Sequence, residues 1–183
     1  FKAPHAPYQP SKKWKKYYSN ITIPDAELST TNSHDALPDV IKESYRGSKG
    51  YGNAYQKSMR GYYGLISGID EQIGRLRDEL KQLGIADNTI IIYSSDNGYF
   101  TGSRGLKGKE LLYRESVRAP LIIYSPGLPK AHQSRFEDGL FSTVDFAPTM
   151  LDMAGIEAPK QMQGVSLLPL LTRQKSQVNN VVF

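Results

Sequence analysis

The clearest pattern of apolar and polar positions begins at Tyr55. From there, apolar side chains recur at alternating steps of three and four residues, which is the spacing of one face of an α-helix. These positions are Met59, Tyr62, Ile66, Ile69, Ile73, Leu76, Leu80 and Leu83. The pattern predicts one helix of about seven turns that stops at Gly84, because glycine readily takes the left-handed conformation that ends helices.

Two apolar runs without polar alternation follow the predicted helix. They are Thr89–Ser94 and Pro120–Tyr124, and such runs are typical of strands buried on both faces of a parallel sheet. A weaker third strand is predicted over Gly139–Thr143, followed by a helix that Asp145 caps and Gly155 ends. This order of elements predicts an α/β fold in which helices sandwich a mostly parallel sheet.

The first 52 residues have a different texture. Five prolines interrupt any long periodic pattern, so this segment is predicted to be mostly connecting chain with one short helix over Leu37–Tyr45. Residues 53–171 carry the predicted α/β core, and residues 172–183 form a tail or the start of a next segment.

Composition sets the broad class of protein. The 183 residues are 39% hydrophobic and 22% charged, the balance of an ordinary globular domain. The chain has no cysteine, which excludes thiol nucleophiles, cysteine zinc sites, iron–sulfur clusters and disulfides. No apolar run approaches the roughly 18 residues that a membrane-spanning helix needs, so we expect no membrane span.

The net charge of +5 is unevenly spread along the chain. Lysines crowd the first 18 residues, at Lys2, Lys12, Lys13, Lys15 and Lys16. One interpretation is a solvated basic loop or a frayed end. The other is a collar that attracts an anionic partner, because clustered cations concentrate phosphate or sulfate esters. Nucleic acid is not the expected partner, since the segment lacks a recognition-helix pattern and an RNA-binding signature.

Candidate metal ligands lie directly after the first predicted strand. Open α/β sheets bind ligands outside the carboxyl ends of their strands, and Ser95-Asp96-Asn97-Gly98 is placed there. A carboxylate beside an amide oxygen suits Ca²⁺ or Mg²⁺, and Gly98 would let the backbone turn away. The alternative is a plain Asx turn. The following loop, up to Pro120, is rich in glycine and cations, which is typical of a functional loop.

Several stretches along the chain, in this order and spacing, resemble the distal part of the catalytic domain of type I sulfatases, members of the alkaline phosphatase superfamily. The N-terminal stretch is similar to the Pro-His-x-Pro segment of that family. The stretches are Lys2–Pro7, Ile69–Leu76, Ser95–Gly98, Gly108-Lys109, Tyr113–Leu121, Val144–Thr149 and Gly164–Leu170. The resemblance implies an alkaline-phosphatase-like α/β fold.

The resemblance also implies roles for individual residues. Asp96 and Asn97 would be ligands of a calcium ion, in preference to magnesium, that holds the sulfate oxygens. Lys109 would contact the sulfate near the scissile bond, and His5 would bind another sulfate oxygen or the leaving oxygen. These cations would stabilise charge that develops in the transition state. Arg104 stands where many sulfatases have histidine, and is a weak candidate for binding an anionic substrate.

Two features complicate this assignment. Lys107 is a rival of Lys109 for the sulfate-binding role. In addition, sulfatases of this type use a formylglycine made from Cys or Ser in a Cys/Ser-x-Pro-x-Arg signature, and that signature is missing from the 183 residues. Together with the start at Phe1, this predicts a fragment that contains an incomplete catalytic domain. The fragment alone is expected to be inactive, with the nucleophile in a missing upstream segment.

The leading hypothesis is a sulfuric ester hydrolase that cleaves a sulfate monoester on a sulfated carbohydrate or an aryl substrate. Its partners would be sulfated small molecules or polysaccharides, and the family resemblance implies a periplasmic or secreted location. One alternative is a phosphodiester or phosphonate hydrolase of the same superfamily. The other is a non-catalytic module that binds sulfated glycans. The sequence carries no indication of the oligomeric state.

Overall fold

A computed structural model describes residues 1–28, 35–43 and 50–179 of the protein. The chain divides into two compact units, which are described separately here. The first unit comprises Phe1–Ala86 and Ile92–Ile123. The second comprises Asp87–Ile91 and the chain from Tyr124 onward.

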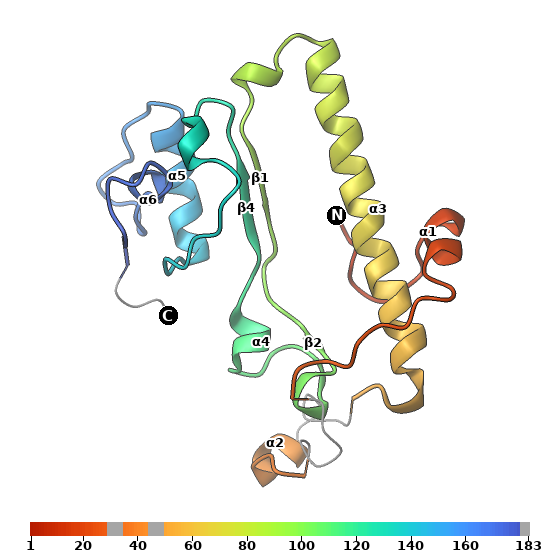
Figure 1. The fold of residues 1–183 in the computed structure, drawn as a ribbon. Coiled ribbons are helices and arrows are strands. Elements are labelled where there is room, and N and C mark those ends of the chain that lie inside the picture. The colour runs from red at the N-terminus through yellow and green to blue at the C-terminus, as the bar shows by residue number, and fades with distance from the viewer. Residues whose placement is uncertain (29–34, 44–49, 180–183) are drawn as a thin grey trace. The chain divides into compact units, whose positions relative to one another are not determined.

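The first unit is organised along the long helix α3 (Tyr55–Gln82), which Figure 1 shows as one continuous element. The predicted helix is therefore confirmed. A short 3₁₀ turn, η2 (Gly52–Ala54), leads into it, and Gly84 follows its end in the left-handed region with φ of 69°. Of the predicted apolar stripe, Met59 and Ile69 are buried, whereas Leu76 is 49% exposed. The first half of the stripe is thus the part that packs within the described chain.

The short helix α1 (Lys12–Tyr17) packs against α3, as Figure 1 also shows. Glycines of α3 allow this close approach. A Cβ atom at Gly61 would lie 2.5 Å from the carbonyl oxygen of Tyr8, and one at Gly64 would lie 2.9 Å from Pro10 Cβ. The interpretation of the basic segment as a loop or a frayed end is therefore wrong. One six-residue helix between prolines is too short to give a periodic signal.

In the described part of the chain, four short strands form two sheets of two strands each. β1 (Ile91–Ser94) pairs with β4 (Leu121–Tyr124), which confirms both predicted strands over a shorter range. Their predicted burial on both faces is wrong for the described chain, since every β1 residue is half-buried and Ile122 is 62% exposed. β2 (Phe100–Thr101) pairs antiparallel with β3 (Lys107–Gly108), and this hairpin was not predicted.

The β2–β3 hairpin has a small core of its own. Phe100 and Leu106 are fully buried and pack with Leu37, which precedes the short helix α2 (Asp39–Glu43). Helix α2 confirms the core of the helix predicted over Leu37–Tyr45, whose last two residues lie outside the described ranges. Helix α4 (Arg114–Val117) follows the hairpin and leads into β4. This core fixes the loop that carries the cationic candidates.

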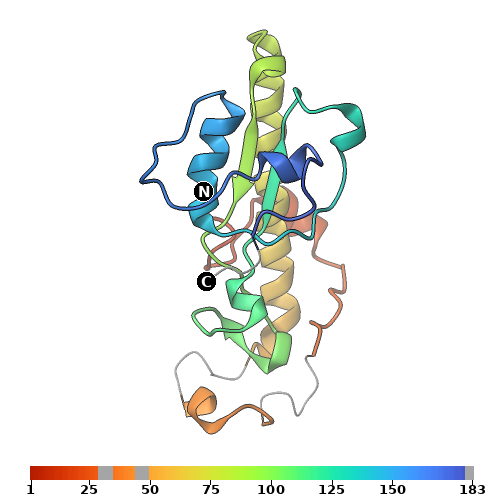
Figure 2. The ribbon, with the colours of Figure 1, turned by 90° about the vertical axis from the view of Figure 1, so that its left-hand side faces the viewer.

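The second unit contains the helices α5 (Phe146–Met153) and α6 (Leu168–Leu171), which contact each other and are drawn in blue in Figure 2. Asp145 is 2% exposed and forms a capping box with Ser142. Its carboxylate also accepts hydrogen bonds from the backbone N–H of Val165 and from Asn179 Nδ2, at 2.8 and 2.9 Å. Asp145 thus stands at the N-cap position of α5 as predicted, but its side chain caps the preceding 3₁₀ turn and makes no capping hydrogen bond to α5 itself. Gly155 lies beyond the helix with φ of 72°.

The strand predicted over Gly139–Thr143 is wrong, because this segment is irregular and ends in a 3₁₀ turn at Thr143–Asp145. Its backbone bonds to a side chain in place of a neighbouring strand: the Ser142 N–H donates to the Asp145 carboxylate at 2.8 Å. Gly139 lies so close to Leu170 that a Cβ atom would be 2.6 Å from its Cδ2. The segment is thus fixed by the capping box and by contact with α6, not by a sheet.

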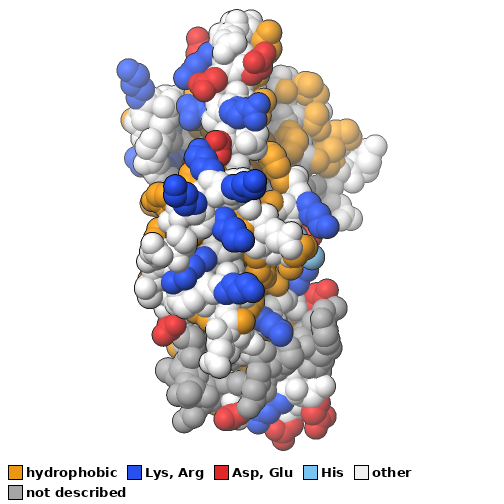
Figure 3. Space-filling model, turned by 90° about the vertical axis from the view of Figure 1, so that its right-hand side faces the viewer, with side chains coloured by type: hydrophobic (Ala, Val, Ile, Leu, Met, Phe, Trp, Pro, Cys, Tyr) orange, Lys and Arg blue, Asp and Glu red, His pale blue; other side chains and the backbone are white. Residues whose placement is uncertain are grey.

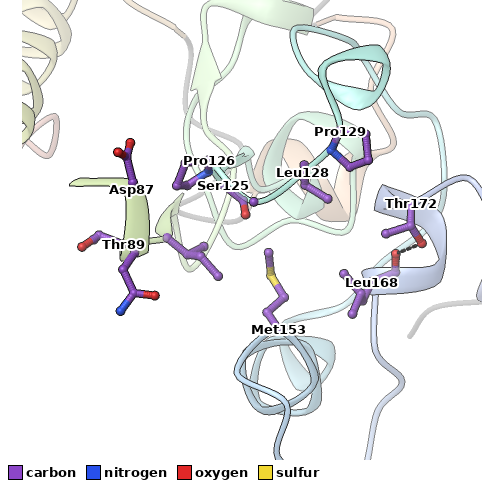
Figure 4. A pocket seen from close by; sticks show the side chains of 12 residues that line it. Asp87, Thr89, Ser125, Pro126, Leu128, Pro129, Met153, Leu168 and Thr172 are labelled. Atoms are coloured by element: carbon purple, nitrogen blue, oxygen red, sulfur yellow. Dashed lines mark hydrogen bonds between the residues drawn. The ribbon is translucent and has the colours of Figure 1, made fainter. Parts of the chain in front are cut away.

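The second unit also carries an open cavity of about 330 Å³. Figure 4 shows Met153 of α5, Leu168 of α6 and the Ser125–Pro129 loop around it. Most of the residues around the cavity are apolar or glycine. None of the site residues predicted from the sequence is among them. In the part of the chain that the structure describes, no helix has the length and apolar content needed to cross a lipid bilayer.

Candidate functional site

The candidate site begins at the turn that leaves β1. Gly98 N–H donates to the carbonyl oxygen of Ser116 at 2.8 Å, which brings the turn directly against α4. A Cβ atom at Gly98 would clash with the carbonyl oxygens of Glu115 and Arg118. Gly98 does not have a positive φ, so the reason for glycine is the predicted avoidance of a Cβ clash and not a left-handed conformation. Close backbone packing requires it instead.

Lys109 and Asn97 come together at this turn. Lys109 Nζ donates to Asn97 Oδ1 at 2.9 Å, and Asn97 Nδ2 donates to the carbonyl oxygen of Gly98 at 2.7 Å. The side chain of Lys109 is half-buried, whereas its rival Lys107 is exposed. An ammonium group has three N–H donors, so Lys109 keeps donors for an anionic ligand while one of them holds Asn97.

Lys109 is held by the hairpin before it and the helix after it. Gly108, at the end of β3, has φ of 90°, a conformation that favours glycine. On the other side, the backbone N–H of Glu110 donates to Ser116 Oγ at 2.9 Å, and Ser116 is buried. Ser116 thus binds both segments of the site, through its carbonyl oxygen to Gly98 and through its hydroxyl to Glu110.

Asp96 and Asn97 are the candidate metal ligands. The Asp96 side chain is exposed and accepts a hydrogen bond from Ser95 Oγ at 3.2 Å. A carboxylate and an amide oxygen are the donors that Ca²⁺ and Mg²⁺ prefer. Calcium takes about six to eight oxygen ligands. Within residues 1–28, 35–43 and 50–179, no group of three or more His, Asp or Glu side chains is placed to hold a metal ion. The donors therefore fit a hard cation but supply only part of its shell.

His5 lies in the N-terminal loop and is exposed. Its Nδ1 donates to the carbonyl oxygen of Ala6 at 2.7 Å, so in the neutral ring Nε2 is the nitrogen that accepts a proton. Among the described residues, no hydrogen bond connects His5 with Asp96, Asn97 or Lys109. The structure therefore joins Lys109 and Asn97 directly and places His5 on a separate segment.

A cluster of four tyrosines links that segment to the turn. We call Tyr8, Tyr51, Tyr62 and Tyr99 the tyrosine cluster. Tyr8 OH donates to Tyr99 OH at 2.9 Å and lies 3.1 Å from Tyr51 OH, and the rings of Tyr62 and Tyr99 stack with centroids 6.2 Å apart. Burial raises the pKa of Tyr8 and of Tyr51, so both hydroxyls stay protonated at neutral pH. Tyr8 lies three positions after His5, and Tyr99 lies two positions after Asn97. The cluster thereby connects the N-terminal loop to the turn after β1.

No sequence motif marks this cluster, because its members are far apart in the chain. The sequence predicts no function for three of them and places Tyr62 only in the apolar stripe of α3. Only their burial and their mutual hydrogen bonds in the structure single them out. The cluster could therefore be identified only in the folded structure.

Arg104 is engaged by neighbouring side chains. Its Nε lies 3.0 Å from Glu115 Oε1, and its guanidinium carbon lies 5.1 Å from the ring centroid of Tyr113. Arg104 itself has φ of 57° within the loop between β2 and β3. The carboxylate of Glu115 offsets the charge of Arg104, so a substrate anion meets a guanidinium that is already paired.

Comparison with protein families matches one family to most of the chain. The family model described as Sulfatase matches residues 1–156. An N-acetylglucosamine-6-O-sulfatase from Bacteroides thetaiotaomicron is 45% identical over 120 residues, which are 66% of this chain and 21% of the relative. An extracellular sulfatase SULF-1 homolog from Drosophila melanogaster is 33% identical over 186 residues, 98% of this chain and 16% of the relative.

Solved structures give the same result. One structure, in complex with its substrate D-glucosamine-2-N,6-O-disulfate, is 28% identical with a TM-score of 0.76, and the match covers 98% of this chain and 48% of that one. A phosphonate monoester hydrolase from Silicibacter pomeroyi is 26% identical with a TM-score of 0.74, over 97% of this chain and 36% of that one. The chain thus spans less than half the length of each of these four relatives and has the α/β fold of their superfamily.

Proposed function

Because the chain belongs to the sulfatase family, we propose that the protein is a sulfuric ester hydrolase that cleaves sulfate monoesters. The observation that carries the proposal is the 2.9 Å hydrogen bond between Lys109 Nζ and Asn97 Oδ1. It puts an ammonium group beside the side-chain oxygen of Asn97, the residue that follows Asp96 at the end of β1. A sulfate monoester repels nucleophiles through its own oxygens, so cations gathered around it lower the barrier to attack.

A sulfated carbohydrate is the proposed substrate. Both relatives named above are sulfatases, one of them named for N-acetylglucosamine, and one similar structure holds a disulfated glucosamine. The similarity to the Drosophila relative, an extracellular sulfatase, supports the proposal that this protein is periplasmic or secreted. An aryl sulfate would serve as a convenient reporter substrate, because its leaving group is coloured.

In this proposal Asp96 and Asn97 hold a divalent cation, Ca²⁺ in preference to Mg²⁺, because calcium tolerates mixed carboxylate and amide ligands with irregular geometry. When bound, that ion supplies positive charge against the sulfate oxygens. The remaining ligands and the nucleophile, a formylglycine in the resemblance, would lie outside these 183 residues. The part described by the structure would then be inactive by itself.

Lys109 and His5 are the proposed catalytic residues. The half-buried ammonium group of Lys109 donates to a sulfate oxygen with an N–H that Asn97 does not use. His5 keeps its Nδ1 proton on the Ala6 carbonyl oxygen. The proton for the departing alcohol oxygen would therefore come from Nε2 of the doubly protonated ring, which is left neutral by the transfer. Arg104 would add only weakly to substrate binding, because Glu115 already pairs with it.

The test compares Lys109→Ala with Lys107→Ala in the full-length protein, using p-nitrophenyl sulfate and glucosamine 6-sulfate. We expect Lys109→Ala to lower kcat/KM by about 100-fold to 1,000-fold, because it removes a donor aimed at developing charge. The exposed Lys107 is the matched control, and its variant should stay within about twofold of the wild type, as surface substitutions usually do. Equal losses in both variants, or no sulfate release by the wild type, would contradict the proposal.

A second candidate is a phosphonate or phosphodiester hydrolase of the same superfamily. The observation that supports this second candidate is the similarity to a phosphonate monoester hydrolase, with a TM-score of 0.74. The two functions separate in a direct comparison of kcat/KM for an aryl sulfate and an aryl phosphonate monoester. A preference for the phosphonate by orders of magnitude would select the second candidate. A protein that binds sulfated glycans without turnover of any ester, and without response to calcium, would instead be a binding module.

A further inference from the structure

The net positive charge of the protein lies in its first 24 residues. They contain five lysines and no Asp or Glu, whereas the rest of the chain has 18 Lys and Arg against 18 Asp and Glu. Four of the five lysines belong to α1. Figure 3 shows the side of the molecule on which α1 and α3 lie, with Lys and Arg side chains gathered along it. The charge imbalance of the sequence is therefore concentrated on one small helix.

The geometry of α1 separates its residues into two faces. With 3.6 residues per turn, Lys12 lies beside Lys15 and Lys16, three and four positions on. Trp14 comes about 160° away from Lys16, on the side toward α3. All three lysines are exposed, and within the described ranges none of them has an acidic partner. Lys12, Lys15 and Lys16, which we call the lysine face, thus point away from the helix that supports them.

Side chains on the opposite side of α1 hold the helix in place. Trp14 Nε1 donates to Glu71 Oε2 at 2.8 Å, and Tyr18 OH lies 2.9 Å from Ser67 Oγ. The fourth lysine, Lys13, donates to Glu71 Oε1 at 2.7 Å and lies 4.6 Å from the Trp14 ring centroid. Lys13 is thereby neutralised and belongs to the attachment of α1. The lysine face keeps its full charge.

Three like charges at these spacings repel one another and weaken an isolated helix. Here the packing on α3 orders the backbone of α1, so the three lysines are held on one face before a ligand binds, and only the rotamer freedom of their exposed side chains remains to be lost. An anion with several negative groups along its length would relieve the repulsion and contact all three ammonium groups at once. A single sulfate ion would be too small to contact all three ammonium groups at the same time.

We propose that the lysine face is a docking surface for an extended sulfated polysaccharide, distinct from the site at Asp96, Asn97 and Lys109. The inference rests on the proposed function, because a polymer held on α1 would be one whose sulfate esters the protein cleaves. Sulfate esters and lysines both stay charged through the neutral pH range, so binding is governed by ionic strength. A six-residue helix is short for reading a nucleic-acid groove, which makes the polysaccharide the favoured polyanion.

The test measures heparin binding to the full-length protein by calorimetry at several salt concentrations. The variant Lys12→Gln/Lys15→Gln/Lys16→Gln removes the lysine face, and glutamine keeps the helix propensity. Its matched control, Lys130→Gln/Lys160→Gln/Lys175→Gln, removes the same charge from exposed positions of the second unit. We expect the first variant to lose about tenfold or more of its heparin affinity at low salt, with a shallower salt dependence, and the control to lose less than about threefold.

Further measurements keep the outcomes apart. The fluorescence of Trp14 reports whether α1 still packs on α3 in each variant, and a triple lysine-to-arginine variant should retain heparin binding. Turnover of p-nitrophenyl sulfate should be unchanged in the first variant, since the small ester does not need the lysine face. Equal loss in both glutamine variants, or equal affinity for duplex DNA of matched charge, would overturn the docking surface. If no ester is cleaved but heparin binding still depends on the lysine face, the proposed function fails and the docking surface stands.

Discussion

The hydroxyl group of Tyr8 connects two parts of the candidate site that no other described hydrogen bond connects. It lies within hydrogen-bonding distance of both Tyr51 and Tyr99 and is partly buried among the surrounding rings. A buried hydroxyl that loses its partner keeps the cost of its desolvation. Tyr8 thus stabilises the position of the N-terminal loop relative to the turn after β1, and His5 depends on that loop.

Tyr8→Phe tests this contribution without changing the ring. We expect the free energy of unfolding to fall by about 1–2 kcal/mol, because the hydroxyls of Tyr51 and Tyr99 lose a partner inside the cluster. Urea unfolding measures the change. Tyr17→Phe is the control, since the Tyr17 side chain is 61% exposed, and it should shift stability by less than about 0.5 kcal/mol. Equal changes in the two variants would show that the hydroxyl network contributes nothing.

Two glycines offer a second test at the scale of single residues. Gly98→Ala places a methyl group against the carbonyl oxygens of Glu115 and Arg118, so the turn that carries Asn97 must move. We expect a loss of about 1–3 kcal/mol, the range for overpacked positions. Gly74→Ala, on α3 with nothing within 4 Å of the added atom, should stabilise the protein by about 0.5–1 kcal/mol through helix propensity.

Thermal unfolding of both glycine variants gives the comparison. A Gly98→Ala variant as stable as the wild type would show that the turn and α4 can separate without cost. Equal destabilisation by both substitutions would show that the close approach at Gly98 is not the cause.

At the scale of elements, α1 is attached to α3 through a charge that titrates. Hydrogen bonds from Lys13 and from Trp14 lower the pKa of Glu71 below its ordinary value of 4.5. Since the pKa is lower in the folded than in the unfolded chain, the carboxylate stabilises the fold above the unfolded pKa. This contribution is lost as the pH falls through the folded pKa.

We therefore expect α1 to loosen from α3 in the acidic range below pH 4.5. Trp14 is the only tryptophan of the chain, so its fluorescence reports the change directly. In Glu71→Gln the attachment no longer depends on a titrating carboxylate, and the acid transition should disappear from the fluorescence signal. A transition that persists unchanged in Glu71→Gln would assign it to other carboxylates.

Helix α3 spans 28 residues, so its apolar period was unmistakable. β1 and β4 have only four residues each, and they were predicted from unbroken apolar runs without any period. Helix α1 and the β2–β3 hairpin have at most six residues per element, too few to show a period. The segment 139–143 has a strand-like composition, but the capping box of Ser142 and Asp145 uses its backbone instead.

For the whole molecule, the order of helices and strands was sufficient to predict the α/β class, and the family comparisons agree with it. The expected burial of the strands failed, because burial depends on which neighbours cover a sheet and not on the strand's own composition. Within the site, the family resemblance implied roles for Asn97 and Lys109, and a hydrogen bond joins the two side chains. The tyrosine cluster and the Arg104–Glu115 pair arise only from folding, since their members are remote from each other in sequence.

The hydrogen bonds of the buried Asp145 carboxylate indicate where the second unit ends. Its carboxylate collects donors from Ser142, Val165 and Asn179, three points spread over nearly forty positions of the chain. The residues after Leu171 are therefore not a dispensable appendage. A chain cut there would keep an anion in the interior with one of its three donors gone, so the natural boundary of this unit lies at Asn179 or beyond.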